Sequence, residues 1–152
     1  MKTFTDCMGR TWTVTINVGT IKRVKTMLGI NLLEAITDDL AEKLKNDVCM
    51  LVDVLYVICK NEADAKNITD ENFGEAMAGD ALENATNAFL DELIDFFPAE
   101  KKMILRKAIN KVNQAEKKAL EMGNKYIEDM QIDKQIETKL LNIFSGAMNL
   151  QE

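Results

Sequence analysis

The best candidates for a catalytic or ion-binding site in this chain are acidic side chains at helical spacing. Asp91 and Asp95 stand four residues apart with Glu92 between them, in a segment whose apolar residues recur with a helical period. Carboxylates at this spacing share a helix face and can act as a general acid and base, or bind a hard cation. The other interpretation is the solvated face of an amphipathic helix. We favour it because no further residue completes a catalytic set.

The sequence offers few residues that could bind a metal ion or act as a reactive thiol. It contains no histidine, which excludes Glu-x-x-His di-iron sites and most zinc sites. Its three cysteines are Cys7, Cys49 and Cys59. Cys49 and Cys59 would stand roughly 15 Å apart along one apolar helix, too far for a disulfide, and we expect them to be inert packing groups. We therefore expect a reduced intracellular chain with no metal, no cofactor and no enzymatic activity.

An apolar helix expected at residues 47–59 is the element around which the other helices would pack. Apolar residues occupy nearly every position of this stretch, so both sides of the helix need cover. Each large apolar side chain that becomes buried contributes about 1.5 to 3 kcal/mol, which outweighs any surface feature. Asp53 is the one charge inside this helix. It is either buried with a partner or placed at the one solvent-facing edge.

The N-terminal segment predicts a β-hairpin with strands at residues 3–5 and 11–16 and a turn at Gly9. Trp12, Val14 and Ile16 alternate with threonines, a period of two in residues that favour strands. Two strands alone are marginal in water and leave unpaired edges. The hairpin should therefore either dock on the helices or pair with a hairpin of another subunit. The second option makes Trp12, Val14 and Ile16 candidates for self-association in a homo-oligomer.

Local signals predict the helices that surround the central one. A short helix with Ile21 and Val24 ends at Gly29, and a polar connector is expected at residues 60–67. Pro98 ends the helix that carries the three acids. The remaining signals are an apolar stripe at Leu32, Ile36, Leu40 and Leu44, and caps at Asn46, Thr69 and Asp80, the last as a capping box with Glu83.

The C-terminal third contains more alanine and more charge than the rest. One helix is expected from residue 99 to a stop at Gly123, with Asn124 and Asp133 as caps of two further helical pieces. The last piece has an apolar face formed by Ile136, Leu140, Ile143 and Phe144.

Together these elements predict an α+β fold that is predominantly α-helical, with an N-terminal β-hairpin followed by a bundle of about six to eight helices. We expect residues 1–98 to form a core domain and residues 99–152 a helical C-terminal extension packed on the same domain. The N-terminus lacks the apolar run of a signal peptide, and the stretch at 48–59 is shorter than the roughly 20 residues that span a bilayer. A cytoplasmic protein without a membrane partner is expected.

Charge is segregated along the chain, although the net charge is only -6. Residues 61–100 contain eleven acids and one base, whereas residues 101–125 contain eight bases and two acids. The basic block lacks the interleaved aromatic residues that stack nucleobases, and no glycine-rich loop follows a strand, so nucleic acid and nucleotide partners are disfavoured. The two blocks could fold against each other or bind a protein partner. The candidate partner-binding residues are Asp91, Glu92, Asp95, Lys101, Lys102, Arg106 and Lys107.

Several stretches within about the first hundred residues resemble a known family. They are Phe4–Asp6, Gly9–Val14, Ile21–Val24, Leu51–Tyr56, Phe73–Ala81 and Phe96–Pro98. In these stretches the sequence is similar to small phage proteins encoded among tail-assembly genes, the tail assembly chaperones of long-tailed phages and prophages. The resemblance implies a mostly helical, often oligomeric, non-enzymatic protein in the bacterial cytoplasm. Its implied partner is the tape-measure protein, which such chaperones coat until tail-tube subunits polymerise around it.

Two other functions stay open at this point. A structural virion component, such as a tail-completion or head–tail connector subunit, would fit the same gene neighbourhood and size. A regulatory module that binds nucleic acid through Lys101–Lys125 is the second alternative, and its binding would weaken steeply with salt.

Overall fold

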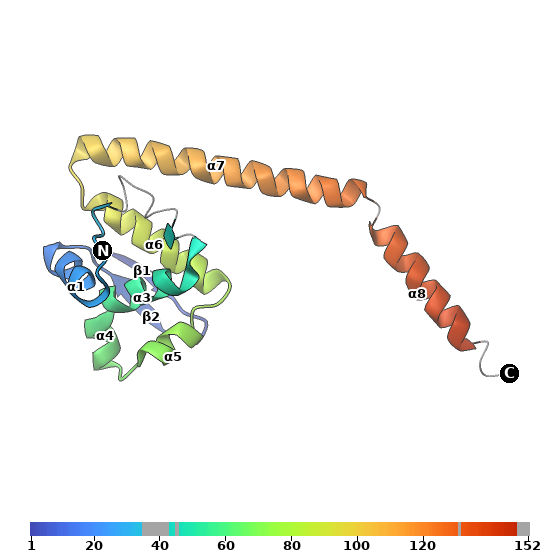
Figure 1. Ribbon diagram of the computed structural model, residues 1–152, viewed down its shortest axis with the longest axis horizontal. Coiled ribbons are helices and arrows are strands. Elements are labelled where there is room, and N and C mark those ends of the chain that lie inside the picture. Colours follow the sequence, from blue (N-terminus) through green and yellow to red (C-terminus); the bar gives the residue numbers. More distant parts are fainter. Residues whose placement is uncertain (35–42, 45, 131, 149–152) are drawn as a thin grey trace. The chain divides into compact units, whose positions relative to one another are not determined.

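The computed structural model describes residues 1–34, 43–44, 46–130 and 132–148, and it confirms the predominantly helical α+β fold. Two strands and seven helices lie within these residues (Figure 1). The chain divides into two units, Met1–Arg106 and Lys107–Glu152. The elements are β1 (Lys2–Thr5), β2 (Thr11–Val14), α1 (Val18–Leu28), α3 (Val48–Ile58), α4 (Lys60–Ala65), α5 (Asp70–Glu75), α6 (Asp80–Asp95), α7 (Ala99–Asp129) and α8 (Ile132–Met148).

The predicted β-hairpin forms, although its second strand ends at Val14 and not at residue 16, and one carboxylate organises its turn. β1 and β2 pair antiparallel with Phe4 opposite Trp12. Asp6 Oδ1 accepts hydrogen bonds from the backbone N–H groups of Met8 and Arg10, at 3.0 and 2.9 Å. Gly9 has a φ of 78°, which a side chain would disfavour. The turn is therefore defined by an Asp side chain that mimics backbone and a glycine in the left-handed region.

The hydrophobic core of the first unit lies between the β-hairpin and the helices of that unit, and α3 is one of these helices (Figure 1). α3 contacts α1, α4, α5 and α6, as expected of the most apolar helix. The rings of Trp12 and Phe73 pack edge to face with centroids 4.8 Å apart. Both side chains are fully buried, as are Leu55 and Phe89. Residues from one strand and three helices thus share one core.

Three predicted helix ends are confirmed. Gly29 ends α1 with a φ of 70°. The start of that helix was not predicted, and there Asn17 is the cap, because its side chain accepts a hydrogen bond from the N–H of Thr20 at 2.9 Å. Thr69 caps α5 by accepting from the N–H of Asn72 at 3.2 Å. α6 ends at Asp95, and Phe96 is the cap residue before Pro98.

Other predicted ends are wrong. Asp47, one residue after the predicted Asn46, caps α3 by accepting from the N–H of Met50 at 3.0 Å. The capping box at Asp80 does not form, because Gly79 occupies the cap position with a φ of 55° and Asp80 is already the first helical residue. The polar connector at 60–67 contains α4 instead. Of the predicted leucine stripe, Leu32 and Leu44 are buried, while Ile36 and Leu40 lie outside the described residues.

The C-terminal helices are longer than predicted. α7 continues through Gly123 and Asn124 to Asp129, so neither residue ends or caps a helix. A glycine in a helix interior costs only about 1 kcal/mol relative to alanine, and the good helix formers around it make up that cost. α8 begins at Ile132, so Asp133 lies inside the helix and does not precede it. The first unit includes the start of α7 up to Arg106, whereas the sequence predicted a core that ends at Pro98. None of the described helices combines the length and the apolar character needed to cross a membrane.

Candidate functional site

The predicted acidic and basic residues meet at the end of α6. Asp95 Oδ1 accepts hydrogen bonds from Lys102 Nζ at 2.6 Å and from Arg106 Nη2 at 2.8 Å. Lys2 Nζ lies 3.5 Å from Asp95 Oδ2. These hydrogen bonds hold the pKa of Asp95 well below its usual range. Asp95 therefore stays ionised, and at this point the two charge blocks fold against each other, one of the two options that the sequence left open.

Asp91 lies at the edge of this ion cluster. Its Oδ1 is 3.7 Å from Arg106 Nη1, and half of its side chain is exposed. Lys101 is engaged differently, because its Nζ lies 4.5 Å from the centre of the Phe97 ring. Lys107 is exposed and begins the second unit. The carboxylates of Asp91 and Asp95 thus form ion pairs with basic side chains of the same chain. They are not arranged as a general acid and base that face a common substrate site.

Glu92 is buried, although the sequence predicted it on or near the solvent-facing side of its helix. Only 6% of this residue is exposed, and its Oε2 lies 2.6 Å from the nitrogen of Met1. No other polar group in the described part of the chain pairs with this oxygen. The prediction failed because β1 packs beside α6, and a strand from the other end of the chain leaves no trace in the local pattern of α6.

Trp12, Val14 and Ile16 are buried inside the protomer. Trp12 and Val14 have no exposed surface, and Ile16 has 7%. The hairpin thus takes the first of the two predicted options and docks on the helices. These three side chains supply the core and leave no surface of their own for contact with a second copy, which corrects their assignment as self-association residues.

The outer edge of β2 is occupied by side chains of the chain itself. The N–H of Thr13 donates to Glu62 Oε2 at 2.9 Å, and Lys66 Nζ donates to the carbonyl of Thr11 at 2.6 Å. The Cys59 thiol contacts the carbonyl of Thr13 at 3.6 Å. Glu62 and Lys66 also pair with each other at 2.6 Å. Burial by itself would raise the pKa of Glu62, but the hydrogen bonds from Lys66 and Thr13 outweigh it and lower that pKa.

The three cysteines and Asp53 do not form a reactive site. Cys59 is buried, and burial raises the pKa of its thiol to about 12, so it remains protonated. Cys49 was predicted to pack in the core, but it lies in the first turn of α3 and is exposed. Asp53 is exposed as well, which is the solvent-edge alternative. Partial burial and the nearby charges of Asp70 and Asp47 raise the pKa of Asp53.

The second unit presents apolar side chains to solvent along both of its helices. α7 contains no buried residue over its 31 positions. On α8, Ile136, Leu140 and Phe144 are 52%, 49% and 66% exposed. The sequence predicted the apolar face of α8 and assigned it to packing within the bundle. Among the residues of this unit whose exposure the structure describes, the large exposed apolar ones are Val112, Leu120, Met122, Tyr126, Ile127, Met130, Ile136, Leu140, Leu141, Ile143 and Phe144.

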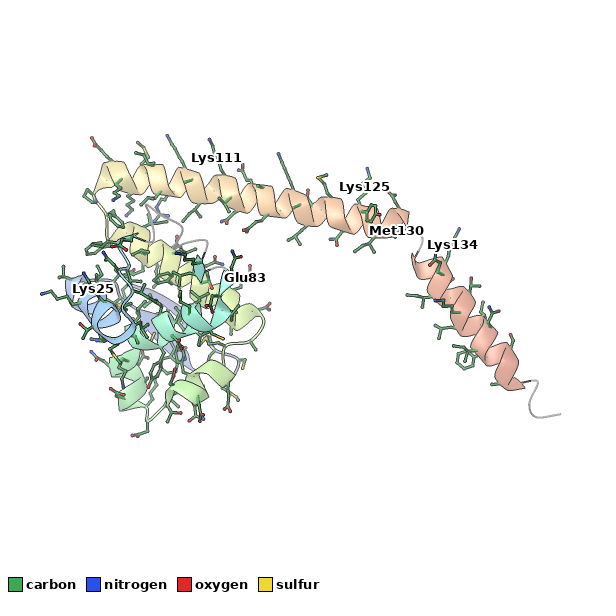
Figure 2. The ribbon with its side chains drawn as sticks, viewed as in Figure 1. Lys25, Glu83, Lys111, Lys125, Met130 and Lys134 are labelled. Atoms are coloured by element: carbon green, nitrogen blue, oxygen red, sulfur yellow. The ribbon has the colours of Figure 1, made fainter. Side chains whose placement is uncertain are left out.

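Lysines accompany this apolar surface. Lys111 and Lys125 extend from α7, and Lys134 extends from α8 (Figure 2). Lys111, Lys118 and Lys125 follow one another at steps of seven residues, so they lie along one line of the helix. The described residues contain no group of three or more histidine, cysteine or acidic side chains that could hold a metal ion. The described part of the second unit thus combines exposed apolar side chains with exposed lysines.

Comparisons of the chain with protein-family models, with curated proteins and with solved structures found no match.

Proposed function

We propose that this protein is a non-enzymatic tail assembly chaperone of a long-tailed phage or prophage, which binds the tape-measure protein during tail assembly. The stretches of the first hundred residues that resemble such chaperones motivate the proposal. The observation that carries it is the exposed apolar surface of α7 and α8. Monomeric proteins rarely leave apolar patches of this extent uncovered unless a partner binds there.

The spacing of the apolar residues favours a helical partner. On α7, Val112, Ala119 and Tyr126 recur at steps of seven, which is the repeat by which two helices pack along a seam. On α8, Ile136, Leu140 and Ile143 mark one face. A tape-measure protein, as a long helical chain, offers the complementary surface for such seams.

The lysines beside the α7 seam add a preference for charge. Lys111, Lys118 and Lys125 would flank an apolar seam and attract a partner helix with acidic residues along its border. Such surface pairs contribute little to affinity in high salt, whereas the apolar seam is insensitive to salt. The proposed complex is thus held by apolar contacts and oriented by charge.

Co-purification tests this proposal. The tagged protein is expressed with the long, helix-rich product of the neighbouring gene, and the soluble fraction is tested for capture of that product. A double variant, Leu140→Ser with Phe144→Ser, removes two exposed apolar side chains from α8 without disturbing a core. Lys139→Ser on the same helix is the matched control. We expect capture by the unaltered protein and by the control, and a loss of capture by the double variant.

Two outcomes would contradict the proposal. Equal capture by the double variant would remove the apolar face of α8 from the binding surface. No capture, together with presence of the protein in finished phage particles, would favour the structural virion component. A gel shift with DNA at low salt checks the regulatory alternative, because binding through the lysines of α7 would weaken steeply as salt rises.

A further inference from the structure

The outer edge of β1 differs from the sealed edge of β2. The N–H of Thr13 points to Glu62 and away from β1, so Thr3 and Thr13 form a non-hydrogen-bonded pair of the antiparallel ladder. Thr5 and Thr11 form the next pair of this kind, because such pairs alternate along the strands. The backbone N–H and C=O groups of Thr3 and Thr5 therefore point away from β2. No hydrogen bond from any other described residue reaches these four groups.

A pocket of about 600 Å³ runs along this open edge. Residues Met1–Thr5 form one wall, and Asn84, Asn87, Ala88 and Asp91 of α6 form the other. Asn84 and Asn87 are exposed, and each amide can both donate and accept a hydrogen bond. An extended segment of four residues, about 13 Å long, would match the length of β1. It would meet unused backbone groups on one side and amide side chains on the other.

The charges around the pocket favour a basic side chain in the bound segment. Glu92 contacts the Met1 nitrogen, and Asp95 has three cationic partners. Asp91 differs, because its one ion pair with a described residue, at 3.7 Å to Arg106, is long and 51% of its side chain is exposed. A lysine or arginine in the segment would find a carboxylate there with capacity for a closer contact.

We propose that the cleft between β1 and α6 binds an extended segment of a partner protein, which adds to β1 as a third antiparallel or parallel strand and places a basic side chain beside Asp91. Strand addition of this kind draws its affinity from main-chain hydrogen bonds. A second copy of this chain would have to bring its own α6 alongside the same edge, because α6 flanks β1 in every copy. A single strand without a flanking helix meets no such obstacle. The site lies within the first unit, and its test does not depend on the role proposed for the apolar residues of α7 and α8.

Fluorescence anisotropy with the full-length protein tests the site. The probe is a labelled peptide Thr-Val-Arg-Val-Thr, compared with a peptide that has Glu for Arg and with one that has Pro for both Val residues. We expect saturable binding of the first peptide and about tenfold weaker binding of the Glu peptide. We expect no binding of the Pro peptide, because it lacks the backbone N–H groups of both Val positions and its prolines do not fit a paired strand. Absence of saturable binding of the first peptide, or equal binding of all three, overturns the proposal.

Variants of the protein locate the binding edge. Thr5→Pro removes an outward N–H that the β1–β2 ladder does not use, so the hairpin should persist while affinity falls about tenfold. Thr11→Pro makes the same change on the edge of β2 and should leave affinity unchanged. Asp91→Asn, at a half-exposed position, should weaken only the Arg peptide and keep the proposal testable if Thr5→Pro disturbs folding. Undiminished affinity in Asp91→Asn and in a folded Thr5→Pro would place binding elsewhere.

Discussion

The indole Nε1 of Trp12 donates a 2.8 Å hydrogen bond to Oδ2 of Asp6, which ties the largest buried side chain to the carboxylate that organises the hairpin turn. Asp6 also accepts from Arg10 Nε at 2.7 Å and is itself buried. Burial alone would raise the pKa of Asp6, but the hydrogen bonds from Trp12 and Arg10 outweigh it and lower that pKa. The turn, the strand pairing and the core therefore depend on one charged group.

Removal of this carboxylate should strongly destabilise the first unit. Asp6→Ala leaves the Trp12 N–H buried without an acceptor and takes away the partner of Arg10, so we expect a loss of about 3 kcal/mol in the free energy of unfolding. Urea unfolding followed by Trp12 fluorescence measures it. Asp64→Ala, which removes an exposed ion pair with Lys60, is the control and should change stability little. A similar effect in both variants would contradict the buried role of Asp6.

Acid should destabilise the protein through the carboxylates whose pKa is lowered. The pKa values of Asp6, Glu62 and Asp95 are all lower in the folded chain than in the unfolded chain. The unfolded chain therefore takes up protons first, and the stability from these groups, complete at neutral pH, falls as the pH drops below about 5. Urea unfolding from pH 7 to pH 3 should show this loss. Asp95→Asn should reduce the loss, and an unchanged pH profile would argue against the cluster around Asp95.

Asp53 should have the opposite effect. Its pKa is raised, so the ionised form present at neutral pH opposes folding and protonation relieves that cost. Asp53→Asn is therefore expected to raise the melting temperature at pH 7 and to have a smaller effect at pH 3, where Asp53 is largely protonated in both states. Thermal unfolding followed by circular dichroism at both pH values checks this. A lower melting temperature at pH 7 would mean that the Asp53 charge has a stabilising partner.

The three thiols should separate into two reactivity classes. Cys7 and Cys49 are exposed, whereas Cys59 is buried with a thiol pKa of about 12. A thiol reagent at pH 8 should label two cysteines quickly in the folded protein and the third only after unfolding. The variant Cys59→Ala should lose the slow reaction and keep the fast ones. Rapid labelling of all three residues in folded protein would show that the Cys59 environment opens readily.

Much of the fold could be predicted because its signals are local. Gly29 and Thr69 act within one helical turn of their own positions, and the alternation around Trp12 is a property of one strand. Gly123 shows the limit of this reasoning. A glycine marks a helix end only when the residues after it favour another conformation, and in α7 they favour helix.

The candidate sites depended on contacts between distant parts of the chain, which a local pattern does not contain. Glu92 is buried because the N-terminal strand lies beside α6. The N–H of Thr13 donates to Glu62, which lies on α4 and 49 residues further along the chain. The periodicity of α6 reports which residues are apolar, and it carries no information about the strand that covers a carboxylate. By contrast, the charge blocks that adjoin in the sequence offered the pairing of Asp95 with Lys102 and Arg106 as one of two options, and the choice between them needed the structure.

The side chains of Cys59, Glu62 and Lys66 that occupy the β2 edge also limit how far this sheet can grow. A hairpin with two open edges can bind further strands on both sides, because each added strand presents a new edge to the next one. Here one side is permanently blocked, so the sheet can extend in a single direction only. The hairpin can therefore end a stack of strands but cannot stand in the middle of one, so copies of this chain cannot build a continuous sheet by adding hairpin to hairpin.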